Sequence, residues 1–285
     1  MNPILGTAAL LAALHGQTDT YGGSVALYAR DLTTGQEVAI DADVPVPTAS
    51  VIKLTILFEA LKQMQAGTAH WNDPVTMTKA DQVGGSGVLH FLDTPQTLTF
   101  KDVLTMMVVQ SDNTATNLAI DKLGIDAIDK RIVWMGLKDT WLYKKVFSPP
   151  VGPMPADQPK FGLGKTTARE IAAVMTRFQT CDLNAPGDTT APSDADKTLC
   201  ATAIGILKQQ MDSYSMPRYI TGMEIAHKTG SLDAVRNDVG IVYAKNGPIV
   251  ISAFTYDNKD TSWTADNAGQ LLIGRLTKIV VDAWQ

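Results

Sequence analysis

Residues 48–65 read TASVIKLTILFEALKQMQ, a very apolar stretch that carries two polar side chains one helical turn apart, Ser50 and Lys53. Apolar residues recur in it at helical spacing and Gly67 follows it, so we predict a helix over residues 50–65 that is buried on most faces. Positions i and i+3 share a helix face, which lets the amine of Lys53 reach the hydroxyl of Ser50. Serine is also a common helix cap, but a lysine among apolar neighbours requires a partner. The pair is therefore a candidate nucleophile and base.

Patterns on both sides of this helix predict the fold class. Alternating residues predict strands near both chain ends, over residues 24–30, 37–40, 225–232, 239–244 and 249–257. Helical spacing predicts helices over residues 4–14, 100–109, 114–123, 168–178, 199–211 and 264–284. We therefore expect an α+β fold, with one antiparallel sheet built from both chain ends and a helical insertion between them. Residues 148–164 are rich in proline, so we expect an irregular surface loop there, and a loop of this length is usually functional.

The composition is that of an ordinary globular protein. The chain has 285 residues, 45% of them hydrophobic and 19% charged, and a formal net charge of -5 without a run of Lys or Arg. This charge argues against nucleic acid or an anionic membrane as the main partner. The apolar segment 4–14 is too short to span a bilayer and lacks the flanks of a secretion signal. We interpret it as a helix packed on the body of the protein.

The two cysteines, Cys181 and Cys200, have a spacing that fits no zinc motif. A disulfide that closes the segment between them would contribute about 3 kcal/mol, and we predict one, with two unpaired thiols as the open alternative. The four histidines are His15, His70, His90 and His227. Their spacing is not that of a metal site, so we predict surface or packed histidines and no metal.

Two further short motifs carry polar groups. Ser111-Asp112-Asn113 lies in the break between two predicted helices, and Lys228-Thr229-Gly230 lies on a predicted strand. Taken alone, the first is typical of a helix cap and the second of an exposed strand. Gly84-Gly85-Ser86-Gly87 approaches the nucleophile elbow of Ser-His-Asp hydrolases but lacks the glycine two places after the serine. Gly164-Lys165-Thr166 lacks the first glycine of a phosphate-binding loop.

Taken together, Ser50 with Lys53, then Ser111-Asp112-Asn113, then Lys228-Thr229-Gly230 resemble the motifs of the active-site serine family of class A β-lactamases and penicillin-binding proteins. The flanking residues look like the family's own contexts, and the resemblance covers nearly the whole chain. It implies a three-layer α+β fold, in which two terminal helices flank a five-stranded antiparallel sheet. It also implies one catalytic domain over residues 1–285, with a sheet lobe (1–47 and 217–285) and a helical lobe (48–216).

The resemblance implies four catalytic residues. Ser50 would attack a carbonyl and become an acyl-enzyme, and Lys53 would accept its proton if burial and the nearby Lys228 lower the pKa of Lys53. Ser111 would pass a proton to the leaving group, and Lys228 would hold Ser111 in place. The implied substrates are β-lactams, or peptides or esters of D-amino acids, and no cofactor is implied.

The resemblance assigns substrate binding to Asn113, Thr229, Gly230, Ser231 and Arg236. Asn113 would contact the amide of the acyl side chain, and Thr229 would bind a substrate carboxylate. The backbone N–H groups of Ser50 and Ser231 would form an oxyanion hole. Arg236 is the candidate cation for the carboxylate, although its offset from the strand differs from that of the family, and its alternative role is to brace the turn.

One departure concerns hydrolysis of the acyl-enzyme. Class A β-lactamases carry a Glu in an omega loop, with an Asn four residues on, and that Glu directs water to the acyl-enzyme. The corresponding residues 148–164 contain neither, and Asp157 is their only acid, which makes it the candidate deacylation base. If Asp157 is not the base, the neutral amine of Lys53 has to activate the water. We therefore expect slow β-lactam turnover. The alternatives are a D-alanyl peptidase, a small esterase or amidase, and a non-catalytic penicillin-binding sensor.

The resemblance also implies a location and a mode of action. The chain would begin near a mature N-terminus after removal of a secretion signal, so we expect a periplasmic or secreted protein. We expect a monomer that acts on a small-molecule substrate, without nucleic acid and without a membrane span.

Overall fold

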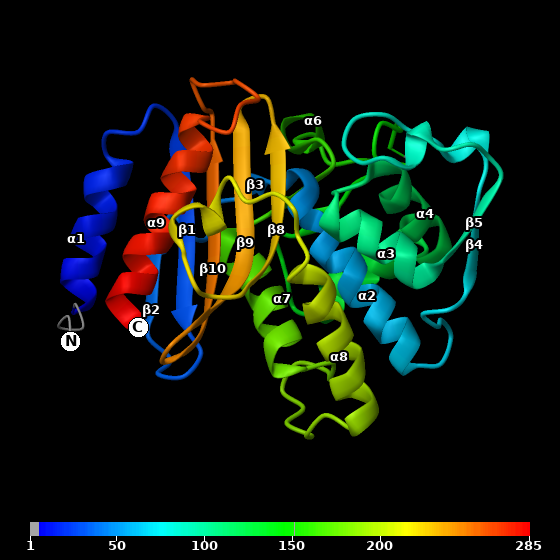
Figure 1. The fold of residues 1–285 in the computed structure, drawn as a ribbon, viewed down its shortest axis with the longest axis horizontal. Coiled ribbons are helices and arrows are strands. Elements are labelled where there is room, and N and C mark those ends of the chain that lie inside the picture. Colours follow the sequence, from blue (N-terminus) through cyan, green and yellow to red (C-terminus); the bar gives the residue numbers. More distant parts are fainter. Residues whose placement is uncertain (1–5, 151) are drawn as a thin grey trace.

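The computed structural model describes residues 6–150 and 152–285 and contains a five-stranded antiparallel sheet with helices on both faces (Figure 1). The strand order is β2-β1-β10-β9-β8. The bounds are β1 Ser24–Asp31, β2 Glu37–Ile40, β8 Ile225–Leu232, β9 Val235–Ala244 and β10 Gly247–Tyr256. Strand β1 pairs directly with β10. The predicted α+β class, with one sheet built from both chain ends, is confirmed.

Strand β9 begins at Val235 rather than at the predicted residue 239. The added residues include Arg236, Asn237 and Asp238, whose polar side chains hid the strand in the sequence. All three are buried, and their side chains find partners inside the protein. Asn237 donates to the backbone carbonyls of residues 47 and 48, and Asp238 pairs with His227 at 2.9 Å. Burial of polar side chains that find partners inside the protein therefore explains the missed part of the strand, and Asn237 Oδ1 alone among the named atoms of these side chains stays without a partner within the described residues.

Two terminal helices, α1 (Thr7–Thr18) and α9 (Ala268–Trp284), cover one face of the sheet (Figure 1). Their apolar side chains and those of the sheet form one of two cores, with members such as Leu10, Leu14, Ile251, Ile273 and Leu276. Helix α9 begins at Ala268 rather than at 264, because the side chain of Asn267 accepts the N–H of Gly269 and caps the helix there. The predicted start of the first helix at residue 4 lies outside the described residues.

The helical part of the chain covers the opposite face of the sheet. Helix α7 (Ala168–Thr180) packs across β1, β9 and β10, and α2 (Lys53–Gln65) contacts most of the other helices. These are α3 (Phe100–Val109), α4 (Asn113–Leu123), α5 (Ile125–Trp134) and α8 (Asp194–Leu207). Their apolar side chains and the facing side of the sheet form the second core. None of the helices in the described residues is long and apolar enough to cross a membrane.

Short elements connect these layers, and the sequence did not predict them. Two small sheets consist of β3 (Val46–Pro47), β7 (Gly164–Thr166) and β6 (Trp141–Leu142), and of β4 (Pro74–Met77) and β5 (Gln96–Thr99). The 3₁₀ turns are η1 (Ala49–Ile52), η2 (Lys79–Asp81), η3 (Leu89–Phe91) and η4 (Met216–Tyr219). Helix α5 was also missed. The strands and 3₁₀ turns are short, so their periodic pattern is weak. Helix α5 has Ile125, Ile128 and Ile132 at helical spacing, and this signal was overlooked.

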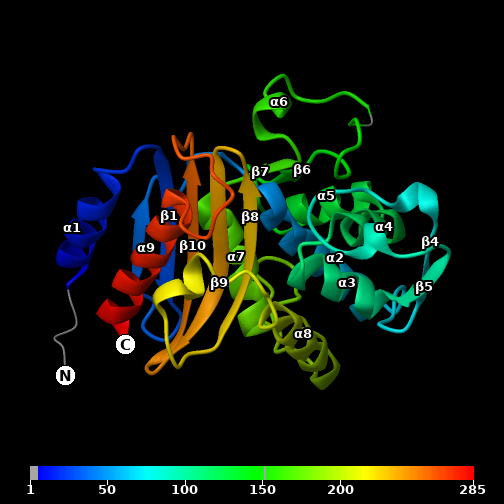
Figure 2. The same cartoon turned by 45° about the horizontal axis from the view of Figure 1, so that its top comes forward.

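The predicted irregular loop over residues 148–164 contains one helical turn, α6 (Gln158–Phe161). Pro159 lies in the first turn of this helix, where its missing N–H has no intrahelical partner to lose. Figure 2 shows that this loop stands out from the body of the molecule beside β7. The prolines therefore exclude a long helix but not a single turn.

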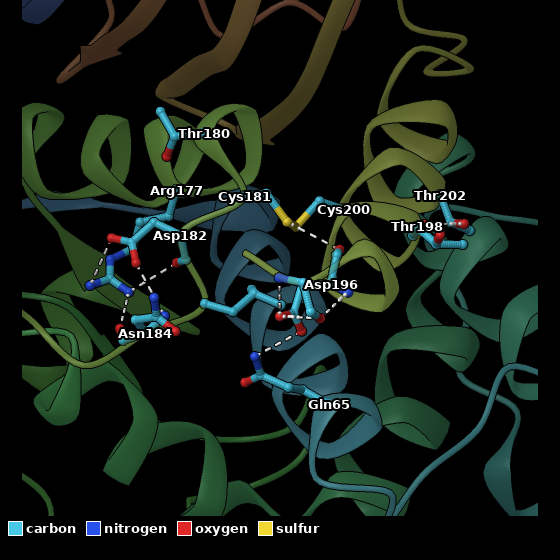
Figure 3. Close-up of a disulfide and its surroundings, with 12 residues drawn as sticks. Gln65, Arg177, Thr180, Cys181, Asp182, Asn184, Asp196, Thr198, Cys200 and Thr202 are labelled. Atoms are coloured by element: carbon cyan, nitrogen blue, oxygen red, sulfur yellow. Dashed lines mark hydrogen bonds and ion pairs between the residues drawn. A yellow bond between two sulfur atoms is a disulfide. The ribbon is translucent and has the colours of Figure 1, made fainter. Parts of the chain in front are cut away.

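A disulfide joins Cys181, at the end of α7, to Cys200 in α8 (Figure 3). The two residues are separated by 19 positions, and closing such a loop contributes about 3 kcal/mol by chain entropy. Helix α8 begins at Asp194 rather than at 199, because Ser193 and Asp196 form a capping box. Asp196 also accepts a hydrogen bond from Gln65 of α2 at 2.8 Å (Figure 3). This corner ties α8 to both α7 and α2.

Candidate active site

Ser50 lies in η1, the short turn that leads into α2 and that also contacts β8 and β9 of the sheet. Ala49 before it has a left-handed backbone with φ of 44°. Such a conformation costs a non-glycine residue roughly 1 kcal/mol and is often found at functional sites. On the sheet side, Gly230 of β8 approaches so closely that a Cβ there would lie 2.9 Å from the backbone nitrogen of Ser50. Only glycine permits this approach, which brings the end of β8 against Ser50.

Lys53 is fully buried at the start of α2. Its Nζ donates to the carbonyl oxygen of Ser111 at 2.7 Å, to Ser111 Oγ at 3.1 Å and to Asn113 Oδ1 at 3.4 Å. Within the described residues Lys53 makes no hydrogen bond to Ser50. Its direct partners are Ser111 and Asn113, and not the serine that helical spacing predicts. Burial lowers the pKa of Lys53 well below its ordinary value, the charge of Lys228 lowers it further, and Asp112 opposes both. These effects favour the neutral amine.

Ser111 lies between α3 and α4 and also has a left-handed backbone, with φ of 53°. Asp112, the next residue, caps α4, as the simplest interpretation of the motif predicts. The same carboxylate accepts the N–H groups of Val88 and Leu89 at 2.7 and 2.8 Å. Asp112 therefore anchors the loop before η3 beside the turn that presents the Ser111 hydroxyl.

Lys228 lies on β8 and is also fully buried. Its Nζ donates to Ser111 Oγ at 3.0 Å and to the carbonyl oxygen of Thr229 at 2.7 Å. Burial lowers the pKa of Lys228 to about 8, although the charges of Asp212 and Asp238 act in the opposite direction. The amino groups of two buried lysines thus converge on one hydroxyl.

Two cavities meet at Ser50. The smaller has a volume of about 310 Å³ and lies on the side of Ser111 and Thr229. The larger has a volume of about 770 Å³ and lies on the side of Asn113 and the loop after β6. Four residues line both cavities: Ser50, Ser86, Ser231 and Trp263. A substrate held at Ser50 can therefore place one portion on each side of the hydroxyl.

The predicted substrate-binding residues line these cavities, with the exception of Arg236. Thr229, Gly230 and Ser231 line the smaller one, and Asn113 lines the larger one. Arg236 is buried below them and donates to the backbone carbonyls of residues 232, 235 and 262. The ring of Trp263 covers its guanidinium, with 4.7 Å between Cζ and the ring centroid. Arg236 therefore braces the turn instead of reaching the cavity, which corrects its predicted contact with a carboxylate.

The structure also places Asp157 outside both cavities. Asp157 precedes α6 on the protruding loop, its side chain is 48% exposed, and its carboxylate lies 3.7 Å from Lys165 Nζ. From the segment between β6 and β7, the residues that line the larger cavity are Lys144, Val146, Phe147, Gly162 and Leu163. This lining is mostly apolar and contains no carboxylate, so the predicted position of a deacylation base at Asp157 is not supported.

Several residues at the site were missed by sequence reasoning. Trp263 is 67% exposed and forms a wall shared by both cavities, and an aromatic residue in a polar loop was the available signal. Asp212 lines the smaller cavity without any motif around it. Val146 is positioned by Asn117, whose side chain bonds to both the N–H and the carbonyl of residue 146 at 2.8 and 3.1 Å. That pairing between distant residues has no signature in the sequence.

No metal centre is present among the described residues, since they contain no group of three or more His, Cys, Asp and Glu side chains that could hold an ion. His227 is a packed histidine, buried and paired with Asp238 on the neighbouring strand at 2.9 Å.

Comparisons with known proteins agree with this geometry. The model of the beta-lactamase enzyme family matches residues 8–284. Beta-lactamase 3 of Bacillus cereus is 28% identical over 268 residues, which cover 92% of this chain and 77% of that protein. The crystal structure of a beta-lactamase from Sphaerobacter thermophilus DSM 20745 is 26% identical, with a TM-score of 0.82 and coverage of 98% of both chains. The structure of PBP-A has the same fold, with a TM-score of 0.80, 23% identity and coverage of 99% and 98%.

The family match extends over nearly the whole chain, including η1 with Ser50, the turn between α3 and α4 with Ser111, and strand β8 with Lys228. The five-stranded sheet and its covering helices agree with the fold of the solved relatives. The chain therefore belongs to the beta-lactamase enzyme family.

Proposed function

We propose that this chain, a serine hydrolase of the β-lactamase type, attacks β-lactams and related amides or esters with the hydroxyl of Ser50 and holds the acyl group there as an ester. One observation carries the proposal. The amino groups of Lys53 and Lys228 both donate to Ser111 Oγ, at 3.1 and 3.0 Å, beside the cavity that contains Ser50. A base of lowered pKa, a hydroxyl and a cation are thus in contact next to a nucleophile.

Proton transfer can follow this chain of contacts. The neutral amine of Lys53 accepts the proton of Ser50 while Ser50 Oγ forms its bond to the substrate carbonyl carbon. The bond to the leaving nitrogen or oxygen then breaks, and that atom takes the proton of Ser111. Lys53 returns its proton to Ser111 across their 3.1 Å contact and is neutral again. Lys228 remains charged and keeps the Ser111 hydroxyl oriented.

The carbonyl oxygen becomes negative when Ser50 attacks, and backbone N–H groups are suited to stabilise it. We assign this role to the N–H groups of Ser50 and Ser231. The close approach of Gly230 to the backbone of Ser50 supports the assignment, because it brings the adjacent residues of β8 and η1 together. Asn113 and Thr229 are assigned to bind the substrate on the two sides of Ser50.

We further propose that β-lactams turn over slowly. Water that attacks the Ser50 ester requires a base, whose contribution is typically about 10²–10⁴-fold. The loop that faces Ser50 contributes the apolar side chains of Val146, Phe147 and Leu163 to the cavity. The regenerated amine of Lys53 is then the base at hand, and its Nζ is already engaged by Ser111 and Asn113.

A small esterase or amidase is the second candidate function. The larger cavity of about 770 Å³ is wide enough for a small acyl group to leave space for water beside the ester. Under this alternative, small esters turn over faster than penicillins, whose acyl portion fills more of the same cavity. A D-alanyl peptidase shares the proposed chemistry and differs only in the substrate.

We also propose that residues 1–285 act as one catalytic domain and that the protein works as a secreted or periplasmic monomer. Ser50 and Lys228 come from the two predicted lobes, so neither lobe holds the complete site. The disulfide between Cys181 and Cys200 supports an oxidising compartment, because such bonds are rare in the cytosol of most organisms.

The test is a time course of intact-protein mass with benzylpenicillin. We expect one adduct of the mass of the penicillin that persists for many minutes, and mapping to Ser50 by peptide analysis. Ser50→Ala should abolish the adduct, while Ser86→Ala, the matched change of another serine that lines both cavities, should retain it. An adduct that survives in Ser50→Ala, or that maps to Ser86, contradicts the proposal.

A further inference from the structure

Phe147 has a backbone conformation that a bulky residue disfavours. Its φ is 55°, and the N–H of Ser148 donates to the carbonyl oxygen of Lys145 at 3.2 Å, which closes a turn around it. A positive φ in a turn is typical of glycine or asparagine and is an outlier for a large side chain. The turn is fixed, because the side chain of Asn117 bonds to both backbone groups of Val146. Outliers of this kind are often found where a side chain has a function.

The ring of Phe147 lies against Gly85, which belongs to a separate segment. A Cβ placed on Gly85 would lie 3.1 Å from Phe147 Cε2 and 2.8 Å from Asn113 Nδ2. The glycine segment is also held in place, since Asn113 donates from Nδ2 to the carbonyl oxygen of Gly84 and from its N–H to that of Ser86, both at 3.0 Å. Phe147, Gly85 and Asn113 all line the larger cavity. The ring therefore connects two anchored segments that border this cavity.

Most of Phe147 is nevertheless in contact with water, because the residue is 72% exposed. An apolar group that enters the larger cavity beside the ring removes apolar surface from water, which is favourable. A wide group has to displace the ring from Gly85 or to move a turn that Asn117 holds. Both changes disturb packed or hydrogen-bonded groups. The ring is therefore placed to favour narrow apolar groups over wide ones.

We infer that Phe147 determines which acyl groups reach Ser50, because its ring limits the width of the larger cavity. Acyl groups with a narrow side chain are accepted, and those with a wide, branched side chain are excluded. The inference rests on the proposed acylation of Ser50, which leaves the acyl portion of the substrate on the side of Asn113. The substrate class is then a β-lactam, amide or ester with a narrow apolar acyl group.

The experiment compares benzylpenicillin with methicillin, which share the bicyclic nucleus and differ only in the acyl side chain. A methylene group follows the side-chain carbonyl of benzylpenicillin, whereas methicillin has a ring with two ortho methoxy groups at that position. The acylation rate of Ser50 is measured by intact mass at pH 7, and each rate is divided by the rate of alkaline hydrolysis of the same compound. We expect methicillin to react about 10²-fold more slowly, since a steric misfit in a pocket has an effect of this size.

Phe147→Ala removes the ring and keeps the backbone of the turn. We expect the two normalised rates in this variant to lie within about tenfold of each other, mainly because methicillin reacts faster. Phe147→Leu, with a side chain of intermediate size, should give an intermediate ratio. Phe91→Ala is the matched control, because Phe91 is 77% exposed and lines neither cavity, and it should keep the wild-type ratio. Melting curves of the three variants check that the fold is retained.

The outcomes separate the two proposals. If the wild type acylates equally fast with both compounds, if Phe147→Ala keeps the wild-type ratio, or if Phe91→Ala lowers it to the same extent, the selection by Phe147 is wrong and acylation of Ser50 stands. If benzylpenicillin forms no adduct with the wild type, or if the adduct persists in Ser50→Ala, the proposed function itself is overturned.

Discussion

The two walls of the Ser50 site differ in chemistry. On one wall, Lys53 and Lys228 are fully buried and converge on the hydroxyl of Ser111. On the other wall, the loop after β6 contributes the apolar side chains of Val146, Phe147 and Leu163, together with Lys144 and without a carboxylate. Both walls line cavities that include Ser50, so the difference lies in their functional groups and not in their access to the nucleophile.

This contrast separates the making of an acyl-enzyme from its hydrolysis. Attack by Ser50 requires a base, a proton donor to the leaving group and a fixed cation, and the polar wall holds all three types of group. Hydrolysis requires a base that faces a water molecule on the acyl side, and the mostly apolar wall offers no carboxylate for this role. The difference between the walls therefore predicts a protein that acylates well and deacylates slowly. Three substitutions and the dependence on pH test this difference.

The largest effect is expected when the polar wall loses its base. Lys53→Arg keeps the positive charge but cannot give it up, so we expect the acylation rate to fall by about 10³-fold. Stopped-flow labelling with a fluorescent penicillin measures the rate, and far-UV circular dichroism checks the fold. A variant that acylates within about tenfold of the wild type indicates that Lys53 only positions Ser111.

The next effect is expected when the apolar wall gains a base. Val146→Glu places a carboxylate on a residue whose backbone is held by Asn117 and that lines the cavity of Ser50. We expect the Ser50 adduct to hydrolyse about 10²-fold faster, because the carboxylate can activate water on the acyl side. Val146→Gln is the control of equal size without a base. Equal gains in both variants would show that space, and not basicity, limits hydrolysis.

A smaller effect is expected from pH, and it reports on the polar wall. Acylation should rise with pH as Lys53 loses its proton, since the pKa of Lys53 is lowered by burial. It should fall above pH 8, because the pKa of Lys228 is about 8 and its neutral form no longer orients Ser111 as a cation. The fall approaches about tenfold per pH unit for one ionisation. In Lys228→Arg the fall should be absent, and a fall that persists assigns it to another group.

The smallest effect is expected at Asp157. This exposed carboxylate forms a 3.7 Å ion pair with Lys165, and such surface pairs contribute about 0–1 kcal/mol. Asp157→Asn should leave both acylation and deacylation within about twofold of the wild type. The same mass time course measures both steps. A collapse of deacylation in this variant would mean that the protruding loop folds inward during catalysis.

Prediction from the sequence was most successful where a pattern is local. The bounds of β2, β8 and α3 agree with the structure, because their alternation and helical spacing are continuous. The start of β9 was missed, since Arg236, Asn237 and Asp238 are polar and yet buried. The helix that contains Ser50 was predicted, but its first turn is the 3₁₀ turn η1. Contacts with distant parts of the chain bury the polar start of β9 and the turn at Ser50, so a local pattern does not reveal them.

Predictions for the candidate site also succeeded for local motifs and failed for isolated residues. Ser50, Lys53, Ser111 and Lys228 were identified from short motifs in a fixed order, and the structure brings these four residues together. Arg236 and Asp157 were chosen by charge and position alone, and the structure directs both away from Ser50. Distance along the chain does not predict the direction of a side chain when its partners are backbone carbonyls or a lysine on another element.

The sequence by itself determined the fold class, the family motifs and the sign of the net charge, because each depends on which residues are present and in which order. The tertiary structure decided which groups face Ser50. Asp212 joins the smaller cavity and Val146 the larger one through contacts between segments that are far apart in the chain. It also lowered the pKa of Lys53, since this shift arises from complete burial and from the approach of Lys228 on another element.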